Sequence, residues 1–348
     1  MQCIIPPYIA EKLSKKTQNR GEEIPDDNLA ADKRIREKRK NTKPVISAVR
    51  SGPGDDKMKM KVFDAGQLPI LPGDQVWQQG EPLDALTDKS VKEVISGGTD
   101  TWNFFKKVFK RNSLDNNGVP LVHSVHFREN PTKVYGNAFW NGGQMIYGDG
   151  DGINFASFTS DIDIIAHELT HGIVSFEADL EYKDQSGALN ESFADVFGIL
   201  VKQWATKTPA KKSSWLIGEN ILIGDNYALR SMKAPGTAYT NHPFLDNDPQ
   251  PAVMSDFIKM KDDDGGVHFN SGIPNHAFYV TAIELGGNAW EKAGRIWYAT
   301  LTDRQALKKK ATFSDARKAT IQKAIELFGD KTKEVKAVIK GWDEAEVK

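Results

Sequence analysis

The spacing of hydrophobic and polar positions changes along the chain near residue 155. Before this point, apolar residues alternate with polar ones in several short runs, a period of two that is typical of strands. After it, apolar residues recur every three or four positions, which predicts helices. The expected strands span residues 57–63, 121–127 and 134–140; the expected helices span residues 89–95, 101–110, 161–176, 190–204, 275–285, 289–301, 314–328 and 332–348.

This order of elements predicts an α+β fold with a β-rich N-terminal domain and an α-helical C-terminal domain. Residues 142–152 are rich in glycine and aspartate and are expected to form tight turns. Proline, glycine and serine accumulate in residues 44–54, which indicates an exposed linker. We therefore expect three parts: a leader with its linker at 1–50, the β-rich domain at 51–160 and the helical domain at 161–348, which begins with the helix at 161–176.

Composition narrows the class of protein. With 348 residues, 39% hydrophobic and 27% charged, the chain is typical of a globular protein, and no apolar run reaches the length of a membrane span. The single cysteine, Cys3, excludes a disulfide framework. Residues 1–50 contain 12 Lys and Arg against 7 Asp and Glu, so a leader of charge +5 precedes a body of charge −6. The basic run at 33–40 lacks interleaved aromatic residues, and we expect a solvated surface and no nucleic-acid partner.

One motif carries chemistry that the composition does not reveal. In His167-Glu168-Leu169-Thr170-His171, a helix of 3.6 residues per turn places both histidines on one face with Glu168 beside them. Two imidazoles so placed can hold zinc while the glutamate acts as a base. The motif is short, and a buried amphipathic helix explains it equally well unless a third ligand exists.

The third ligand is expected on the next predicted helix, where Glu191 stands twenty positions after His171. A catalytic zinc site uses three protein ligands and leaves the fourth position for water. The alternative motif H-E-x-x-H-x-x-G-x-x-H requires glycine at 174 and histidine at 177, and the chain has Val174 and Glu177. The spacing therefore favours a distant glutamate over a nearby histidine.

Several blocks in the same order resemble the thermolysin-type (M4-like) neutral zinc metalloproteases, in particular the protealysin-like branch with a short pro-segment. The resemblance runs from about residue 57 to the C-terminus, and its blocks are Asn137-Ala138-Phe139-Trp140, residues 145–150, the two zinc helices, residues 229–232 and residues 265–272. It implies a two-domain metalloendopeptidase with one catalytic Zn²⁺. Such an enzyme would hydrolyse peptides and proteins before bulky apolar residues.

The resemblance also implies a role for individual residues. Zinc would be bound by His167, His171 and Glu191, and Glu168 would be the general base. His268 and Tyr182 would stabilise the oxyanion. Asp263 would orient His268, and Asn190 and Asp195 would hold the zinc histidines. Substrate would be bound by Asn137, Ala138 and Arg230, with an apolar pocket formed by Phe155, Phe158, Ile164 and Leu229.

The chain departs from the family pattern at the calcium sites. Asp163 and Glu219 match the expected carboxylate cluster, but Lys202 replaces a glutamate, and Ser214 and Leu216 replace two further acids. Dependence on Ca²⁺ is therefore in doubt. Two rival classes, an inactive zinc-binding module and a non-peptidase metallohydrolase, are disfavoured because Glu168, the Asn137 block and the His268 block are all present.

Residues 1–50 are expected to be an inhibitory pro-segment that the enzyme removes itself. They lie before the region of resemblance, and Val45, Ile46 and Val49 in the linker suit the expected specificity. Cys3 offers a thiolate that could reach the zinc, although a lone cysteine is more often a bystander. The first eight residues show no standard secretory signal. We therefore expect synthesis in the cytoplasm, export by a non-classical route, no membrane partner and a monomer.

Overall fold

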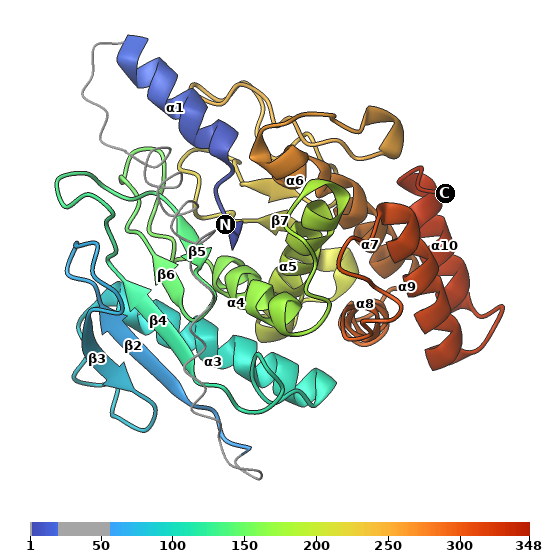
Figure 1. The fold of residues 1–348 in the computed structure, drawn as a ribbon, viewed down its shortest axis with the longest axis horizontal. Coiled ribbons are helices and arrows are strands. Elements are labelled where there is room, and N and C mark those ends of the chain that lie inside the picture. The colour runs from blue at the N-terminus through green and yellow to red at the C-terminus, as the bar shows by residue number, and fades with distance from the viewer. Residues whose placement is uncertain (1, 20–55) are drawn as a thin grey trace. The chain divides into compact units, whose positions relative to one another are not determined.

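The computed structural model describes residues 2–19 and 56–348, and its chain divides into two compact units (Figure 1). The sheet unit comprises Met1–Gly172, Gly218–Tyr227 and Asn241–Asp246. The helical unit comprises Ile173–Ile217, Ala228–Thr240 and Asn247–Lys348. The basic run at 33–40 and the linker at 44–54 lie outside the described residues.

A mixed six-stranded sheet forms the centre of the sheet unit. In chain order its strands are β1 (Gln2–Cys3), β2 (Met60–Asp64), β3 (Asp74–Gln78), β4 (Leu121–Val125), β5 (Ala138–Trp140) and β6 (Met145–Tyr147). Their order across the sheet is β1-β5-β6-β4-β2-β3, with β2–β4 and β4–β6 parallel and the other pairs antiparallel. The expected strands at 57–63, 121–127 and 134–140 correspond to β2, β4 and β5, although β5 is shorter than predicted.

Three strands of this sheet were not predicted, and neither was the separate antiparallel pair of β7 (Leu216–Ile217) and β8 (Arg230–Ser231) in the helical unit. β6 lies inside residues 142–152, where glycine and aspartate predicted only turns, because a three-residue strand leaves no room for a period-two pattern. β1 has two residues, and β3 exposes four of its five positions. A strand that is mostly solvated shows little alternation of apolar and polar residues, so its sequence resembles a loop.

Helix α3 (Lys89–Phe109) corrects the prediction of two helices at 89–95 and 101–110. Gly97 and Gly98 lie between the two predicted helices, and in the structure both lie within one continuous helix. A Cβ atom at Gly97 would come within 2.5 Å of Ile165 Cδ1, and one at Gly98 within 2.8 Å of Met60 Sδ. The glycines therefore allow α3 to approach α4 and the sheet closely, which the local sequence does not reveal.

Most of the remaining helices belong to the helical unit. The helices along the chain are α1 (Pro7–Asn19), α4 (Ile162–Phe176), α5 (Asp184–Ala205), α6 (Asp263–Asn270), α7 (Gly272–Leu285), α8 (Ala293–Leu301), α9 (Phe313–Phe328) and α10 (Lys333–Glu344). The predicted α+β class is confirmed. Helix α6 was not predicted, and α5 begins six residues earlier than expected. Its first turns contain Asp184, Ser186 and Gly187, residue types that disfavour a helix interior, so the local sequence did not predict them.

Helices α7 and α10 pack closely in the helical unit. At Gly341 of α10, a Cβ atom would lie 2.3 Å from the carbonyl oxygen of Ala277 on α7. Trp342 is buried beside it and donates its indole N–H to Thr320 Oγ1 of α9 at 2.8 Å. This packing stabilises the arrangement of α7, α9 and α10. Within the described residues, no helix is long and apolar enough to cross a membrane.

Candidate metal centre and active site

Helix α4 presents the two histidines of the motif as predicted. The Nε2 atoms of His167 and His171 lie 3.0 Å apart, the rings are nearly perpendicular, and both side chains are fully buried. Almost every other residue of α4 is also buried, because apolar residues surround the histidines in sequence. The helix is therefore held firmly on several sides, which fixes the direction of both imidazoles.

Helix α5 carries Glu191, which is also buried. The ligand atoms of His167, His171 and Glu191 lie within 4.8 Å of one another. Zinc bonds to histidine nitrogen at about 2.0–2.1 Å, so tetrahedral geometry requires roughly 3.3 Å between two nitrogens, close to the spacing seen here. A buried carboxylate is also costly without a cation. The donor set therefore fits zinc in type, number and spacing.

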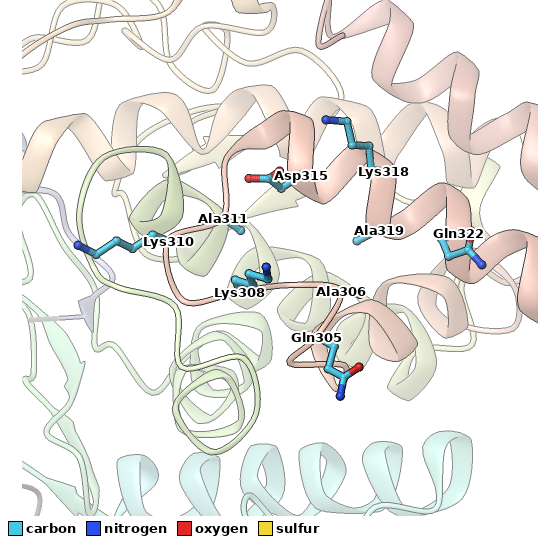
Figure 2. Close-up of a pocket in the computed structure, with 9 residues that line it drawn as sticks. All are labelled: Gln305, Ala306, Lys308, Lys310, Ala311, Asp315, Lys318, Ala319 and Gln322. Carbon is cyan, nitrogen blue, oxygen red and sulfur yellow. The ribbon is translucent and has the colours of Figure 1, made fainter.

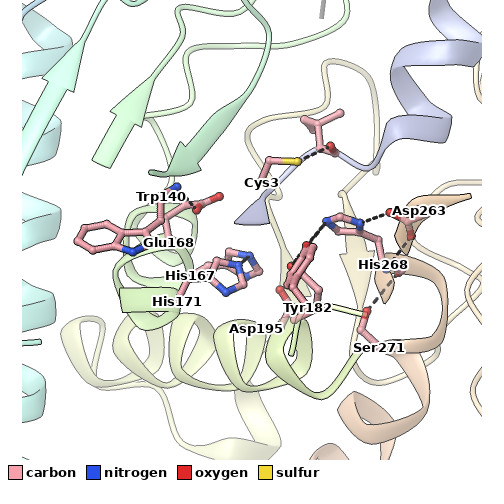
Figure 3. Close-up of polar contacts among 12 residues, drawn as sticks. Cys3, Trp140, His167, Glu168, His171, Tyr182, Asp195, Asp263, His268 and Ser271 are labelled. Carbon is pink, nitrogen blue, oxygen red and sulfur yellow. Dashed lines mark hydrogen bonds and ion pairs between the residues drawn. The ribbon is translucent and has the colours of Figure 1, made fainter. Parts of the chain in front are cut away.

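Glu168 is fully buried beside the two histidines on α4. One of its carboxylate oxygens, Oε2, accepts a hydrogen bond from the backbone N–H of Trp140 at 3.0 Å (Figure 3). Trp140 is the last residue of β5, so the carboxylate is oriented by the strand that also carries Ala138. Sequence reasoning did not find this contact, since a backbone donor leaves no mark in the residue types.

Tyr182, His268 and Asp263 lie together in the helical unit (Figure 3). The Tyr182 hydroxyl lies 3.2 Å from His268 Nε2 and donates a short hydrogen bond to Glu191 Oε1. His268 Nε2 lies 3.7 Å from the same carboxylate oxygen. Asp263 Oδ1 contacts His268 Nδ1 at 2.6 Å, and Asp263 Oδ2 accepts from the His268 backbone N–H at 2.8 Å. The structure thus brings together four residues predicted from separate blocks.

The turn before His268 has an unusual backbone. Asp263, Asp264, Gly265 and Gly266 all have positive φ angles, of 53°, 51°, 95° and 80°. Aspartate and glycine tolerate this region best, which explains the sequence Asp263-Asp264-Gly265-Gly266. At Gly265 a Cβ atom would lie 2.1 Å from Asp184 Oδ1, at the start of α5. The turn therefore depends on glycine both for its conformation and for its contact with α5.

Asn137 and Ala138, predicted to bind substrate, contact the N-terminal residues of this chain. The backbone N–H of Ile4 donates to the Ala138 carbonyl at 3.2 Å, and that of Ile5 donates to Asn137 Oδ1 at 3.0 Å. Strand β1 continues this pairing along β5. Cys3 directs its thiol to the carbonyl of Ile5 at 3.4 Å (Figure 3).

The other predicted substrate residues are buried in both units. In the sheet unit, Phe155 and Phe158 have ring centroids 5.7 Å apart, and Ile164 is buried on α4. Leu229 and Arg230 belong to the helical unit. Arg230 binds Asp195 through Nε and Nη2, both at 2.8 Å. The roles of these residues in substrate binding stay predictions.

Asn190 and Asp195, predicted to hold the zinc histidines, have other contacts as well. Asn190 Nδ2 lies 3.4 Å from the Leu180 carbonyl. Asp195 accepts from Arg230 and also from Asn275 Nδ2 at 2.8 Å. Asn275 was not found by sequence reasoning, because it lies 80 residues further along the chain and belongs to no motif.

Two histidines outside the site show how strongly burial and neighbouring charges shift a pKa. Burial in the sheet lowers the pKa of His123 to about 3, so its ring is neutral and bonds the Tyr147 hydroxyl through Nδ1 at 3.1 Å. In contrast, a hydrogen bond to Asp149 raises the pKa of His126 to about 9, despite partial burial and with help from the charge of Asp88. Neither belongs to the metal centre.

A surface hollow of about 610 Å³ lies elsewhere in the helical unit (Figure 2). Its lining comes from α9 and the segment before it: Gln305, Ala306, Lys308, Lys310, Ala311, Asp315, Lys318, Ala319 and Gln322. It contains none of the predicted site residues. Asp315 belongs to the capping box of α9 with Thr312, so its carboxylate has a structural partner.

Comparison with known proteins agrees with this geometry. Residues 47–175 match the model of the thermolysin metallopeptidase catalytic domain, and residues 178–347 match that of its alpha-helical domain. Protease PrtS of Photorhabdus sp. (strain Az29) is 43% identical over 99% of this chain and 92% of its own length. The extracellular metalloprotease of Pectobacterium carotovorum subsp. carotovorum is 49% identical over 77% of this chain and 75% of its own.

A solved structure resembles the whole chain. The precursor of protealysin, a metalloproteinase from Serratia proteamaculans, superposes with a TM-score of 0.85 at 42% identity and covers 100% of both chains. The resemblance therefore includes the fold as well as the motif blocks. With two matching domain models, close relatives along most of its length and a buried His-His-Glu group, this chain belongs to the thermolysin family of metalloproteases.

Proposed function

We propose that this metalloprotease is a zinc endopeptidase that cleaves before bulky apolar residues and is made as a self-processed zymogen. The observation that supports the chemistry best is the buried group of His167, His171 and Glu191, with Glu168 on the same helix. Bound there, zinc would supply Lewis acidity and lower the pKa of a water to about 7.

The chain's own residues supply the proton transfers and the charge stabilisation. Glu168, oriented by the Trp140 N–H, accepts the proton of the attacking water and passes it to the departing amine nitrogen. General-base help of this kind contributes about 10² to 10⁴ in rate. Tyr182 and His268, 3.2 Å apart, donate to the oxygen of the substrate carbonyl as negative charge develops on it. Asp263 keeps the His268 ring in the orientation for that donation.

Substrate is proposed to add as a strand along β5. Asn137 and Ala138 offer a carboxamide and a carbonyl at this edge, and Arg230 binds a substrate carbonyl further along. Phe155, Phe158, Ile164 and Leu229 form the pocket for the side chain after the cleaved bond. Their apolar character favours Leu, Ile, Phe or Val at that position.

Residues 1–50 are proposed to be the inhibitory pro-segment. The support lies in β1 and the two residues after it, because Ile4 and Ile5 use the backbone and side-chain atoms of Ala138 and Asn137 that the substrate would need. Helix α1 adds an anchor, since Lys12 Nζ donates to the Leu245 carbonyl at 2.7 Å. The protealysin neighbour is itself described as a precursor. A bound pro-segment therefore competes directly with substrate at this edge.

Several finer parts of the proposal rest on the sequence alone. We propose a monomer that is synthesised in the cytoplasm and exported by a non-classical route. One relative is described as extracellular. The proposal assigns no Ca²⁺ site: Asp163 and Glu219 match the expected carboxylate cluster, whereas Lys202, Ser214 and Leu216 replace three expected acids.

The variant Glu168→Gln tests the proposal because it removes the base and keeps the ligands. Zinc content should stay near one per chain, while hydrolysis of an unstructured protein should fall at least about 100-fold. During incubation, intact mass should show that the wild type loses about residues 1–50 and gains activity. Glu168→Gln should keep them unless active enzyme is added. Near-full activity of Glu168→Gln would refute the mechanism, and a full-length wild type that is already fully active would refute the inhibitory pro-segment.

A further inference from the structure

Gln250 contacts His268 at its backbone carbonyl, whereas Asp263 contacts its ring and its backbone N–H. Gln250 is only 4% exposed. Its amide Nε2 donates to the backbone carbonyl of His268 at 2.6 Å and lies 3.2 Å from Ser271 Oγ. Ser271 Oγ donates to the same His268 carbonyl at 3.1 Å. His268 is therefore held through its main-chain oxygen as well as through its ring.

The backbone of Gln250 is itself fixed by Asp248. Asp248 Oδ1 accepts from the Gln250 N–H at 3.1 Å. Its other oxygen accepts from the N–H groups of Gly236 and Ala238, at 3.0 and 3.1 Å. The Asp248 carboxylate is buried and ties residues 236–238 to Gln250, so the base of the Gln250 side chain has little freedom. A side chain that starts from a fixed backbone can fix its partner in turn.

His268 needs such support because of where it stands. It lies two residues before Asn270, the last residue of α6, where carbonyl groups lose their helical partners. The turn before it has four successive positive φ angles, and the N–H groups of Gly265 and Gly266 share one acceptor, the Asp262 carbonyl, at 3.0 and 3.1 Å. Asp263 orients the imidazole, but a ring that pivots with its backbone would still move relative to Tyr182. The Gln250 amide opposes that movement.

We propose that Gln250 is a positioning residue that holds the backbone of His268, and so its imidazole, in place for oxyanion stabilisation. The inference rests on the proposed role of His268. Gln250 does not touch the substrate in this scheme; it acts through its hydrogen bond to the His268 carbonyl. Small displacements of a catalytic group are expensive in rate, so the contact should matter although it lies outside the reacting atoms.

The test is Gln250→Met, which keeps the length of the side chain and removes the donor. We expect kcat to fall about tenfold while KM changes less than about threefold, because only transition-state stabilisation is weakened. Gln203→Met is the matched control: Gln203 is a buried glutamine on α5, and its amide has no hydrogen-bond partner in the described part of the chain. The control should leave kcat and KM unchanged. If Gln250→Met does not fold by circular dichroism, Gln250→Asn, one methylene too short to reach, carries the test.

A double-mutant cycle with His268→Ala decides whether Gln250 acts through His268. In the His268→Ala background the Gln250 substitution should cost almost nothing further. The proposal would be overturned if the Gln250 substitution lowered kcat equally in the wild-type and His268→Ala backgrounds, or in neither. It would also be overturned if His268→Ala itself had a normal kcat. These outcomes are separate from the test of the zinc mechanism, which depends on the activity of Glu168→Gln. Zinc content should be unchanged in every variant of the cycle.

Discussion

The helices that carry the metal ligands and the turn that carries His268 place their side chains in different ways. On α4 and α5, regular backbone and dense packing fix His167, His171 and Glu191, with spacing set by the helical repeat. At 263–268, four positive φ angles and the side chains of Asp263 and Gln250 fix His268. The first arrangement follows the helical repeat. The second is irregular and depends on a few individual contacts, so substitutions in the two regions should differ in their effects on zinc content and on kcat.

The largest effect, on zinc content and activity, is expected from substitution of a metal ligand on α4 or α5. Glu191→Ala removes one of three ligands, so the purified protein should lose its zinc on dialysis and with it essentially all peptidase activity. Metal analysis and activity on the same sample measure both. Glu168→Gln, which sits on the other ligand helix and spares the ligands, is the control and should retain zinc. A Glu191→Ala protein with full zinc content would mean that the ligand set is wrong.

The next largest effect, on kcat, is expected from substitution of His268 after the turn. His268→Ala should lower kcat by the equivalent of about 2 to 4 kcal/mol and leave zinc content unchanged, because the lost hydrogen bond forms fully only in the transition state. Steady-state kinetics on a peptide substrate separate kcat from KM. A change confined to KM would instead make His268 a substrate-binding residue.

The glycine of the turn should have a smaller effect, mainly on stability. Gly265→Ala combines a φ angle of +95° with a contact of 2.1 Å to Asp184 Oδ1. We expect a loss of about 1 to 3 kcal/mol in the free energy of unfolding, together with a reduced kcat. The matched control is Gly286→Ala, at φ +63° with no atom within 4 Å of the new Cβ. If both variants lose equal stability, the contact with α5 is unimportant.

The smallest effect concerns His126, which has two carboxylates beside it, as His268 does, but no place at the metal centre. Its Nδ1 contacts Asp149 at 2.6 Å and its Nε2 contacts Asp88 at 3.1 Å. Because these partners raise its pKa from 6.5 to about 9, the stabilisation is fully present below pH 6.5 and is lost as pH rises through about 9. After screening by solvent it should amount to about 1 kcal/mol.

Urea unfolding at pH 6 and at pH 9.5 measures this contribution, and His126→Gln should reduce the difference between the two. At neutral pH the same variant should keep normal kcat. A loss of activity without a loss of stability would instead show that His126 contributes to catalysis, as His268 is proposed to do.

The sequence predicted the regular region better than the irregular one. His167, His171 and Glu191 follow from a helical repeat and the chemistry of zinc, and α4 begins and ends within one residue of its prediction. Gln250 could not be predicted, because its contact with His268 spans 18 residues and uses a backbone carbonyl. The continuity of α3 was missed for a related reason, since its glycines pack against Ile165 and Met60, which are distant in sequence. Contacts of this kind exist only after folding.

The two edges of the sheet suggest a further consequence of β1. At the β3 edge, the side chains are largely solvated and the strand begins with Asp74, which discourages pairing with another chain. On the opposite side of the sheet, residues 138–140 of β5 are buried and β5 pairs with β1. The β5 edge proposed to accept an extended peptide is also a template for aggregation when newly made chains are concentrated. A strand supplied by the same polypeptide would protect this edge during folding, so early removal of residues 2–5 would lower solubility as well as latency.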